Sequence, residues 1–450
     1  MINFLLDVFK ANASSEAVVW LGQPLTYGQL LERMAFWRNQ IRDRHLSPGA
    51  VVVLESDFTP DSVALFLVLI ESSVILVPLA PASAAKRSES IEIAAPNLEI
   101  IFEAGGNVRW VEHSPAQRHD YYKQLESRRA PGLVLFSSGS SGRMKAAVHD
   151  LSKILEKFKT PRQTLRTISF LLYDHIGGVN TMLYTLSNGG CLITVPDRQP
   201  STVIDAIERH KVELLPTSPT FLNLLLVSGL WKGRDLSSLK TVTYGTEPMP
   251  EETLKRFHAL FPAVRLQQTY GLSELGILRS KSKDSNSLWV KIGGEGFETK
   301  VVEGILHIKA QSAMLGYLNA PSPFSADGWL NTGDAVQVEG EYFKILGRQS
   351  EMINVGGEKV YPAEVEGILK IAENVLDATV YGEKNPLMGN IVCAKVNLLS
   401  AEPKPAAIAR IKSFAAQHLQ KYKVPVKIEI VDEPLHSERM KKMRSGTTGT

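Results

Sequence analysis

The sequence predicts an α/β fold in which a large N-terminal multi-layer α/β domain with a β-rich subdomain is followed by a small C-terminal α+β domain. Apolar runs rich in β-branched residues alternate with helix-like stretches, and this order is typical of parallel sheets covered by helices. From about Lys291 to Ile345 short strands alternate with Gly turns, which favours antiparallel structure. After Gly347-Arg348 a second strand and helix alternation begins. We therefore predict two domains, residues 1–347 and residues 348–450.

Each predicted element is an apolar run with β-branched residues or a helix-like stretch. In the N-terminal domain we expect strands at 51–54, 74–77 and 212–215 and helices at 60–71 and 201–210. In the β-rich part we expect strands at 304–308 and 341–345. In the C-terminal domain we expect helices at 361–370 and 405–420 and strands at 375–382, 391–398 and 427–431. These last elements give a unit of about a hundred residues, an ordinary domain size.

Composition and charge exclude several functional classes. The chain has 450 residues, is 44% hydrophobic and 22% charged, and carries a formal net charge of +3, so it has no overall field for nucleic acid. The two cysteines, Cys191 and Cys393, lie far apart inside apolar runs. We expect buried free thiols there, not a disulfide framework or a zinc site. We expect a monomer or a homodimer.

No segment has the pattern of a secretory leader or a membrane span. The first residues lack a basic stretch before their apolar residues and a small-residue cleavage pattern. The most apolar region, 63–79, is split by Glu71-Ser72-Ser73 and closed at Pro78, so we expect a buried helix followed by a buried strand. The expected compartment is the cytoplasm.

A loop rich in glycine and hydroxyl side chains follows the apolar run Leu133–Phe136 and ends at Lys145. Glycine lets backbone N–H groups converge on an anion, serines add donors and lysine adds a point charge, which together suit phosphate. The loop is not a Walker A loop, because Gly-Lys-Ser/Thr is absent. By itself it could equally be a flexible surface loop.

Further motifs follow in a fixed order. They are Gln268–Glu274 with an aromatic, a hydroxyl and a carboxylate, Trp329–Asp334 with an acid after a turn, Gly347-Arg348 before Gly356–Glu366, and Lys441 near the C-terminus. Together with Leu25–Leu30 and Tyr422–Pro425, they resemble the adenylate-forming superfamily of acyl- and aryl-CoA synthetases, peptide-synthetase adenylation domains and luciferases. The resemblance covers essentially the whole chain.

The resemblance implies that the protein binds ATP and Mg²⁺. The residues that would hold the β- and γ-phosphates are Ser137, Ser138, Gly139, Ser140, Ser141, Gly142 and Lys145. The adenine would lie between Tyr270-Gly271 and the turn Gly245-Thr246-Glu247. Ser273 would donate to the α-phosphate, and Glu274 would bind Mg²⁺, a hard cation that prefers oxygen ligands. Asp334 would accept both ribose hydroxyls, with Arg348 as a second ribose contact.

The resemblance also implies a catalytic lysine and a histidine beside the acid. Lys441 would reach the α-phosphate and the attacking carboxylate, with Lys442 as the alternative. Loss of such a donor typically costs about 10²–10³ in rate. His175 would lie beside the carboxylate, and Ile176 stands where amino-acid-activating relatives carry aspartate, which disfavours an α-amino acid.

The acid is expected to bind near five residues, most of them glycines: His175, Gly177, Gly245, Gly271 and Gly276. These glycines either leave room for a ring or a chain or serve backbone geometry. The sequence leaves aryl and fatty acids open, with a lean towards aryl acids.

The resemblance implies that the C-terminal domain is a mobile lid that turns about Ser350, brings the thiol-channel residues Gly356 and Gly357 to the site and admits CoA. Two alternatives stay open. The acceptor could be the phosphopantetheine of a separate carrier protein. The chain could instead be a catalytically silent nucleotide-binding module, because Met144, Ala146, Ser350, Asn354 and Met440 depart from the usual pattern.

Overall fold

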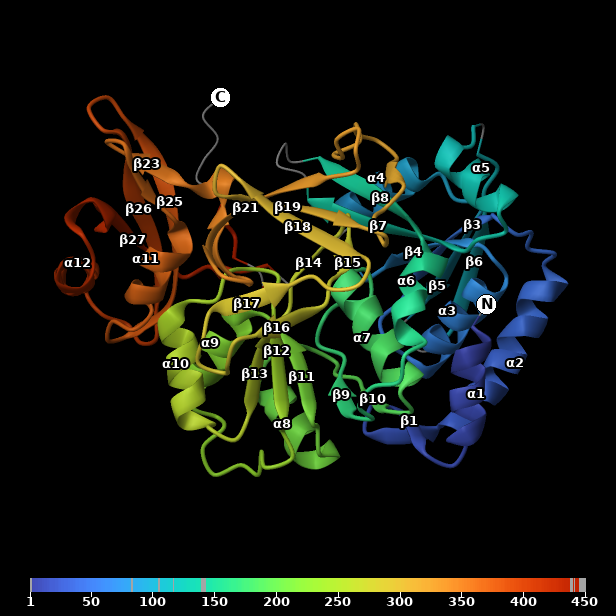
Figure 1. Ribbon diagram of the computed structural model, residues 1–450. Coiled ribbons are helices and arrows are strands. Elements are labelled where there is room, and N and C mark those ends of the chain that lie inside the picture. Colours follow the sequence, from blue (N-terminus) through green and yellow to red (C-terminus); the bar gives the residue numbers. More distant parts are fainter. Residues whose placement is uncertain are drawn as a thin grey trace.

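The computed structural model describes residues 2–81, 84–103, 106–115, 117–138, 143–437, 440 and 442–444. The N-terminal part contains two seven-stranded sheets, one mixed and one mainly parallel. Figure 1 shows an antiparallel sheet beside them and a C-terminal unit at the opposite end from the N-terminus. This arrangement confirms the predicted α/β class with a β-rich subdomain and a small α+β unit.

The first sheet has the order β20-β8-β7-β4-β3-β5-β6. Its strands are β3 (Val51–Glu55), β4 (Ile75–Leu79), β5 (Leu98–Phe102), β6 (Val108–Glu112), β7 (Gly132–Ser138), β8 (Met144–Asp150) and β20 (Gly316–Tyr317). Strands β7, β4, β3 and β5 are parallel, and β6, β8 and β20 are antiparallel to their neighbours. The phosphate-loop motif joins β7 to β8.

The second sheet has the order β13-β12-β11-β9-β10-β1-β2 and is parallel except for β2. Its strands are β1 (Glu16–Trp20), β2 (Gln23–Thr26), β9 (Arg166–Ile168), β10 (Cys191–Ile193), β11 (Leu214–Thr217), β12 (Thr241–Tyr244) and β13 (Arg265–Gln268). The helices that connect or cover them are α7 (Ile176–Ser187), α8 (Pro200–His210), α9 (Pro219–Ser228) and α10 (Glu251–Leu260).

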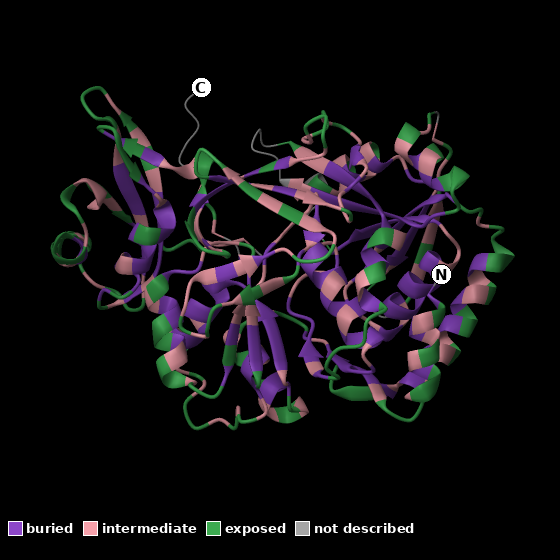
Figure 2. Ribbon diagram, in the orientation of Figure 1, coloured by how far each residue is buried: buried purple, intermediate pink, exposed green. Residues whose placement is uncertain are grey.

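Helices lie between the two sheets in one continuous apolar core. The N-terminal helices are α1 (Asn3–Ala11), α2 (Tyr27–Asp43), α3 (Pro60–Glu71), α4 (Ala84–Ala94), α5 (Asp120–Ser127) and α6 (Leu151–Leu155), followed by the short η1 (Glu156–Phe158). Residues of α1, α2, α3 and α7 join strand residues of the first sheet in this core. Figure 2 shows the buried residues concentrated in these layers.

Helix α3 is apolar on every side because it is buried along almost its whole length. Thr59 caps its first turn by accepting from the Ser62 backbone N–H at 3.0 Å, and Pro60 occupies a first-turn position, where its missing N–H costs nothing. The helix is buried from Pro60 to Ile70 apart from Asp61. The region 63–79 is therefore a buried helix followed by β4, as expected. Within the described residues, no helix is both long enough and apolar enough to cross a membrane.

The antiparallel sheet has the order β16-β17-β22-β21-β19-β18. Its strands are β16 (Ser280–Ser282), β17 (Trp289–Ile292), β18 (Phe297–Val302), β19 (Ile305–Ala310), β21 (Leu330–Glu339) and β22 (Tyr342–Arg348). A small hairpin of β14 (Gly271–Leu272) and β15 (Gly276–Ile277) precedes it. The register of β21 and β22 pairs Asp334 with Arg348 directly across the sheet.

The C-terminal unit has its own sheet and core. Its elements are η2 (Gln349–Glu351), β23 (Ile353–Val355), β24 (Glu358–Val360), α11 (Pro362–Leu369), β25 (Val375–Asn385), β26 (Gly389–Leu398), α12 (Lys404–His418), η3 (Lys421–Lys423) and β27 (Lys427–Ile430). Their buried side chains form a separate cluster. The domain boundary between 347 and 348 stays a prediction. Cys191 and Cys393 are buried free thiols, as expected.

Candidate active site

The nucleotide-site prediction centres on Asp334, and the structure surrounds this carboxylate with two predicted neighbours. The Tyr270 hydroxyl donates to one Asp334 oxygen at 2.5 Å, and Arg348 Nε lies 2.8 Å from the other. Arg348 also donates to the Thr332 carbonyl at 2.7 Å, which fixes the guanidinium over β21. Burial raises the pKa of Asp334, while Arg348 and the Tyr270 hydrogen bond act in the opposite direction.

A small pocket opens beside this pair. Its lining includes Gly245, Thr246, Glu247, Gln268, Thr269, Tyr270, Gly271, Asp334, Arg348, Glu351 and Arg444. The turn after β12 and the turn after β13 thus face the same space, as adenine binding between them requires. An aromatic ring, a paired carboxylate and arginines are suitable partners for a base, a ribose and a phosphate.

The turn between β14 and β15 carries Ser273 and Glu274, and two residues that the sequence did not reveal hold it. The Tyr317 hydroxyl donates to the Glu274 carboxylate. His149 Nε2 lies 2.6 Å from the Ser273 carbonyl oxygen. Burial lowers the pKa of His149 to about 4, so the ring is neutral near pH 7 and must carry its proton on Nε2 to donate to that carbonyl.

Glu274 has the chemistry that Mg²⁺ requires, a carboxylate held in place by a hydrogen bond. Within the described residues, no group of three or more His, Cys, Asp or Glu side chains is arranged for a metal ion. A Mg²⁺ ion at Glu274 would therefore draw its other ligands from ATP oxygens and water, which is how this ion commonly binds.

The phosphate loop begins at β7 and ends at β8. Ser137 pairs across the ladder with Lys145, whose Nζ lies 5.4 Å from the centre of the Tyr317 ring. Gly139, Ser140, Ser141 and Gly142 lie outside the described residues, as does the side chain of Ser138. The described ends of the loop thus lie next to Tyr317, the partner of Glu274.

The C-terminal segment reaches back to the N-terminal part. Ser218 Oγ donates to the Met440 carbonyl at 2.7 Å, and Met440 is buried in the core of the second sheet. The Lys442 backbone N–H donates to Glu247 Oε2 at 3.1 Å, while Glu247 Oε1 accepts from the Thr220 N–H at 2.7 Å. Lys441, the predicted catalytic lysine, lies outside the described residues.

Lys442 has a structural environment that does not suit a catalytic lysine. Its amino group forms an ion pair with Asp377 of β25, and both side chains are only 2% exposed. Lys370 Nζ lies 3.5 Å from the same carboxylate. Burial and the neighbouring Lys370 lower the pKa of Lys442 to about 8, although Asp377 and Glu366 oppose this. The segment therefore places Lys442 inside the C-terminal unit and not in solvent.

Arg444 is a third residue of the site that the sequence did not single out. Its guanidinium makes two hydrogen bonds to Glu366 of α11, at 2.9 and 2.8 Å, and a third to Glu351 at 2.9 Å. It also lines the small pocket beside Asp334 and Arg348, which we refer to as the predicted nucleotide pocket or, for short, the nucleotide pocket. The C-terminal segment is thus anchored by a hydrogen bond at Met440 and by ion pairs at Lys442 and Arg444.

His175 caps helix α7. Its Nδ1 accepts from the Gly177 backbone N–H at 3.0 Å, so this nitrogen carries no proton and the neutral ring carries its proton on Nε2. A ring in this tautomer can donate from Nε2 to a carboxylate.

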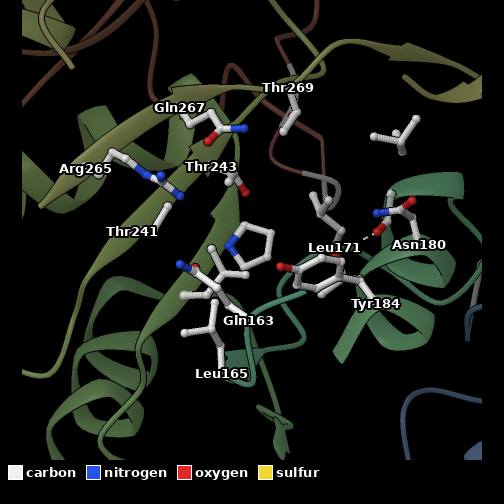
Figure 3. A pocket seen from close by; sticks show the side chains of 15 residues that line it. Gln163, Leu165, Leu171, Asn180, Tyr184, Thr241, Thr243, Arg265, Gln267 and Thr269 are labelled. Carbon is white, nitrogen blue, oxygen red and sulfur yellow. Dashed lines mark hydrogen bonds between the residues drawn. The ribbon is translucent and has the colours of Figure 1, made fainter. Parts of the chain in front are cut away.

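A second pocket of about 210 Å³ lies between α7 and strands β11–β13 (Figure 3). Its lining consists of Gln163, Leu165, Leu171, Gly177, Asn180, Thr181, Tyr184, Leu214, Pro216, Thr241, Thr243, Arg265, Gln267, Thr269 and Ile277. Thr269 lines both this pocket and the nucleotide pocket. A ligand in this second pocket would therefore meet a bound nucleotide at Thr269. Because an acid is expected there, we refer to this second pocket as the acid pocket.

Of the residues expected around the acid, Gly177 lines the acid pocket, whereas Gly245 and Gly271 line the nucleotide pocket. Gly276 lies next to Ile277 of the lining. A Cβ at Gly177 would lie 2.6 Å from Leu171, one at Gly245 would lie 2.8 Å from the Thr269 carbonyl, and one at Gly271 would lie 2.8 Å from the Gly276 carbonyl. Backbone carbonyls thus closely approach Gly245 and Gly271, whereas the Leu171 side chain approaches Gly177. The choice between room for the acid and backbone geometry stays a prediction.

Gly356 and Gly357 form the turn between β23 and β24 and line neither pocket. The turn is packed on the C-terminal unit itself, since Gly356 N–H donates to the Met388 carbonyl at 2.8 Å. In Figure 1 β23 lies at the upper end of the C-terminal unit, next to β25 and β26. The structure does not bring this turn to the predicted site.

Family models match both parts of the chain. Residues 7–318 match the AMP-binding enzyme family, and residues 364–446 match the AMP-binding enzyme C-terminal domain. The chain belongs to the AMP-binding enzyme family. This result confirms the resemblance to adenylate-forming acyl- and aryl-CoA synthetases.

Individual relatives have low sequence identity to this chain, but the matches extend over most of its length. The chain is 26% identical to 4-coumarate–CoA ligase-like 9 of Arabidopsis thaliana over 92% of this chain and 83% of the relative. It superimposes on an anthranilate CoA ligase in complex with anthranoyl-AMP with a TM-score of 0.83 at 20% identity, covering 98% and 95% of the two chains.

A further structural neighbour is an amide bond synthetase from Marinactinospora thermotolerans, with a TM-score of 0.77 at 20% identity and 97% of each chain covered. The structural likenesses establish the fold. The prediction of an enzyme of the acid–thiol ligase class is confirmed by the family match and by the CoA ligases among the relatives.

Proposed function

We propose that this enzyme uses ATP to convert a carboxylic acid into an acyl-AMP and then transfers the acyl group to the thiol of CoA. The observation that carries the proposal is the junction at Thr269, where the acid pocket meets the pocket that contains Tyr270, Asp334 and Arg348. An acid bound in one pocket and a nucleotide bound in the other would bring a carboxylate to an α-phosphate.

In the first step a carboxylate oxygen of the acid attacks the α-phosphorus of ATP, and pyrophosphate leaves. Asp334 and Arg348 orient the ribose, and Tyr270 forms one wall for the base. His175 Nε2 donates to the acid, and Lys441 offsets negative charge in the transition state. Glu274 would hold Mg²⁺, which would supply positive charge to the phosphate oxygens. In the second step the CoA thiol attacks the acyl carbon and AMP leaves.

The domain division at 347/348 fits this scheme, because η2 with Ser350 follows the Asp334–Arg348 pair directly. Rotation there would carry residues 440–444 away from Glu247 and Ser218 and would expose the site to a thiol. The turn at Gly356 and Gly357 would reach the site only after such a rotation. A carrier-protein phosphopantetheine could replace CoA in the same step.

A screen of pyrophosphate release over aromatic, fatty and amino acids, with and without CoA, tests the proposal. We expect one class of acid to release pyrophosphate and to consume CoA in equal amounts. Glu274→Gln should reduce release by at least about tenfold, because one charged Mg²⁺ ligand is lost. If no acid gives a signal, the silent-module alternative is correct. If pyrophosphate is released and CoA stays intact, the acceptor is a different group.

A further inference from the structure

The acid pocket contains a cation with no anionic partner. Arg265 stands at the start of β13, and the described residues offer its guanidinium neither an ion pair nor a side-chain hydrogen bond. None of the lining residues is acidic. Arg265 and Gln163 are the exposed residues of the lining, so the pocket runs from Thr269 at the nucleotide to an open mouth beside them.

The α7 wall opposite Arg265 presents hydrogen-bond donors. Lys157 Nζ donates to Asn180 Oδ1 at 2.5 Å and to the Ile277 carbonyl at 3.0 Å. A lysine can only donate, so Asn180 must turn its oxygen to Lys157, which leaves its NH₂ group as the free end of the amide. Figure 3 shows Asn180 and Tyr184 on the α7 side of the pocket and Arg265 on the sheet side.

Lys157 adds positive charge behind this wall. Burial lowers the pKa of Lys157 to about 8, and the described residues provide no carboxylate within ion-pair distance of it. Tyr184 lies one turn along α7 from Asn180. Burial raises the pKa of Tyr184, and the nearby Arg162 and Arg265 oppose the rise, so the hydroxyl stays protonated and can donate.

The pocket therefore combines positive charge and donors with an absence of acidic groups. A hydrocarbon tail would cover the NH₂ group of Asn180 without giving it a partner, which opposes binding, and it would gain nothing from the exposed charge of Arg265. From this arrangement we infer that the acid carries a second anionic group at the end remote from its reacting carboxylate, and that Arg265 binds it at the mouth of the pocket. The substrate class is a dicarboxylic acid or an equivalent doubly anionic acid. This inference rests on the proposed function.

Matched acid pairs test the inference in the pyrophosphate-release assay. The pairs are benzoate and terephthalate, cinnamate and 4-carboxycinnamate, and hexanoate and adipate. We expect the wild-type enzyme to prefer one diacid over its monoacid partner. Arg265→Gln should lower kcat/KM for that diacid by up to roughly fivefold, because an exposed pair is worth up to about 1 kcal/mol, and should leave the monoacid within about twofold.

Two control variants show whether the effect of Arg265→Gln comes from the lost charge, from the changed side-chain shape or from impaired folding. Arg265→Lys keeps the charge and should retain part of the preference. Arg256→Gln removes an exposed arginine of α10 that does not line the acid pocket, and it should change neither acid. Added salt should raise the KM of the diacid in the wild-type enzyme and have little effect in Arg265→Gln, because exposed charge pairs are screened.

The inference would be overturned if Arg265→Gln lowered kcat/KM equally for the diacid and the monoacid, or if the wild-type enzyme preferred the monoacids. Either result would leave the proposed function intact. A preference for a neutral hydroxylated acid that Arg265→Gln abolishes would also overturn it, because the partner would then be a neutral acceptor. Absence of pyrophosphate release with every acid would refute the proposed function, and this inference would fall with it.

Discussion

Substitution of the two neighbouring lysines should separate catalysis from stability. Lys442 and Asp377 are both 2% exposed, so Lys442→Met leaves a buried carboxylate that has lost its nearer partner. Removing one partner of a buried pair typically costs about 3–5 kcal/mol. Lys370 remains 3.5 Å from Asp377, which places the expected loss at the lower end, about 3 kcal/mol. We expect acyl-AMP formation to survive this substitution.

Lys441→Ala should behave in the opposite way, with adenylation reduced by about 10²–10³ and transfer from preformed acyl-AMP retained. The assays are urea unfolding and ATP–pyrophosphate exchange at a temperature at which every variant is folded. Lys281→Met provides the matched control, because Lys281 is an exposed lysine on β16. A Lys442→Met variant with wild-type stability and no exchange activity would refute the reasoning and assign the catalytic role to Lys442.

Three further outcomes follow from the site. The free energy of unfolding should fall by up to about 3 kcal/mol between pH 6.5 and pH 4. The reason is that His149 binds a proton in the unfolded state, whereas burial lowers its pKa to about 4 in the folded state. In urea unfolding, His149→Gln should lack this loss of stability at low pH. Tyr317→Phe should raise the Mg²⁺ concentration for half-maximal pyrophosphate release roughly tenfold, since Glu274 loses its donor; an unchanged Mg²⁺ titration would contradict this. Asp334→Asn should raise the KM for ATP tenfold or more while the KM for the acid changes little, because the ion pair with Arg348 is lost; an equal rise in both constants would show that Asp334 does not act on the nucleotide.

Periodicity along the chain was sufficient to predict the layers. The helix expected at 60–71 is α3, with the same bounds, because a cap, a proline and an apolar run all indicate one element. The strand expected at 212–215 begins two residues later, at Leu214, since Lys211 ends α8 in a left-handed conformation and the chain needs residues to turn. Boundaries set by such turns are poorly encoded in an apolar pattern.

The grouping of Tyr270, Asp334 and Arg348 was predictable from their motifs: the sheet register pairs Asp334 with Arg348, and Tyr270 donates to Asp334. Their role towards a nucleotide stays a prediction. The supporting residues were not predictable. His149 and Tyr317 act on Ser273 and Glu274 across separations of 124 and 43 residues, and neither belongs to a local pattern. A lone buried histidine in a strand has no periodic signature that separates it from a core residue.

Lys442 shows a second limit on what can be predicted from the sequence. Two adjacent lysines are usually solvated, but Lys442 is buried, because α11 and β25 surround it with Glu366 and Asp377. The partners lie more than sixty residues earlier in the sequence. Only the folded structure shows that one lysine is enclosed by carboxylates.

Glu247 behaves as a latch between the two parts of the enzyme. One of its oxygens holds the Thr220 N–H at the start of α9 and the other holds the Lys442 N–H of the C-terminal segment. Any rotation of the C-terminal unit away from the N-terminal part must break the hydrogen bond from the Lys442 N–H and expose Glu247 Oε2 to water. In the proposed two-step reaction this release would order events in time: the latch is closed while the acid meets ATP, and the thiol gains entry only once it has opened.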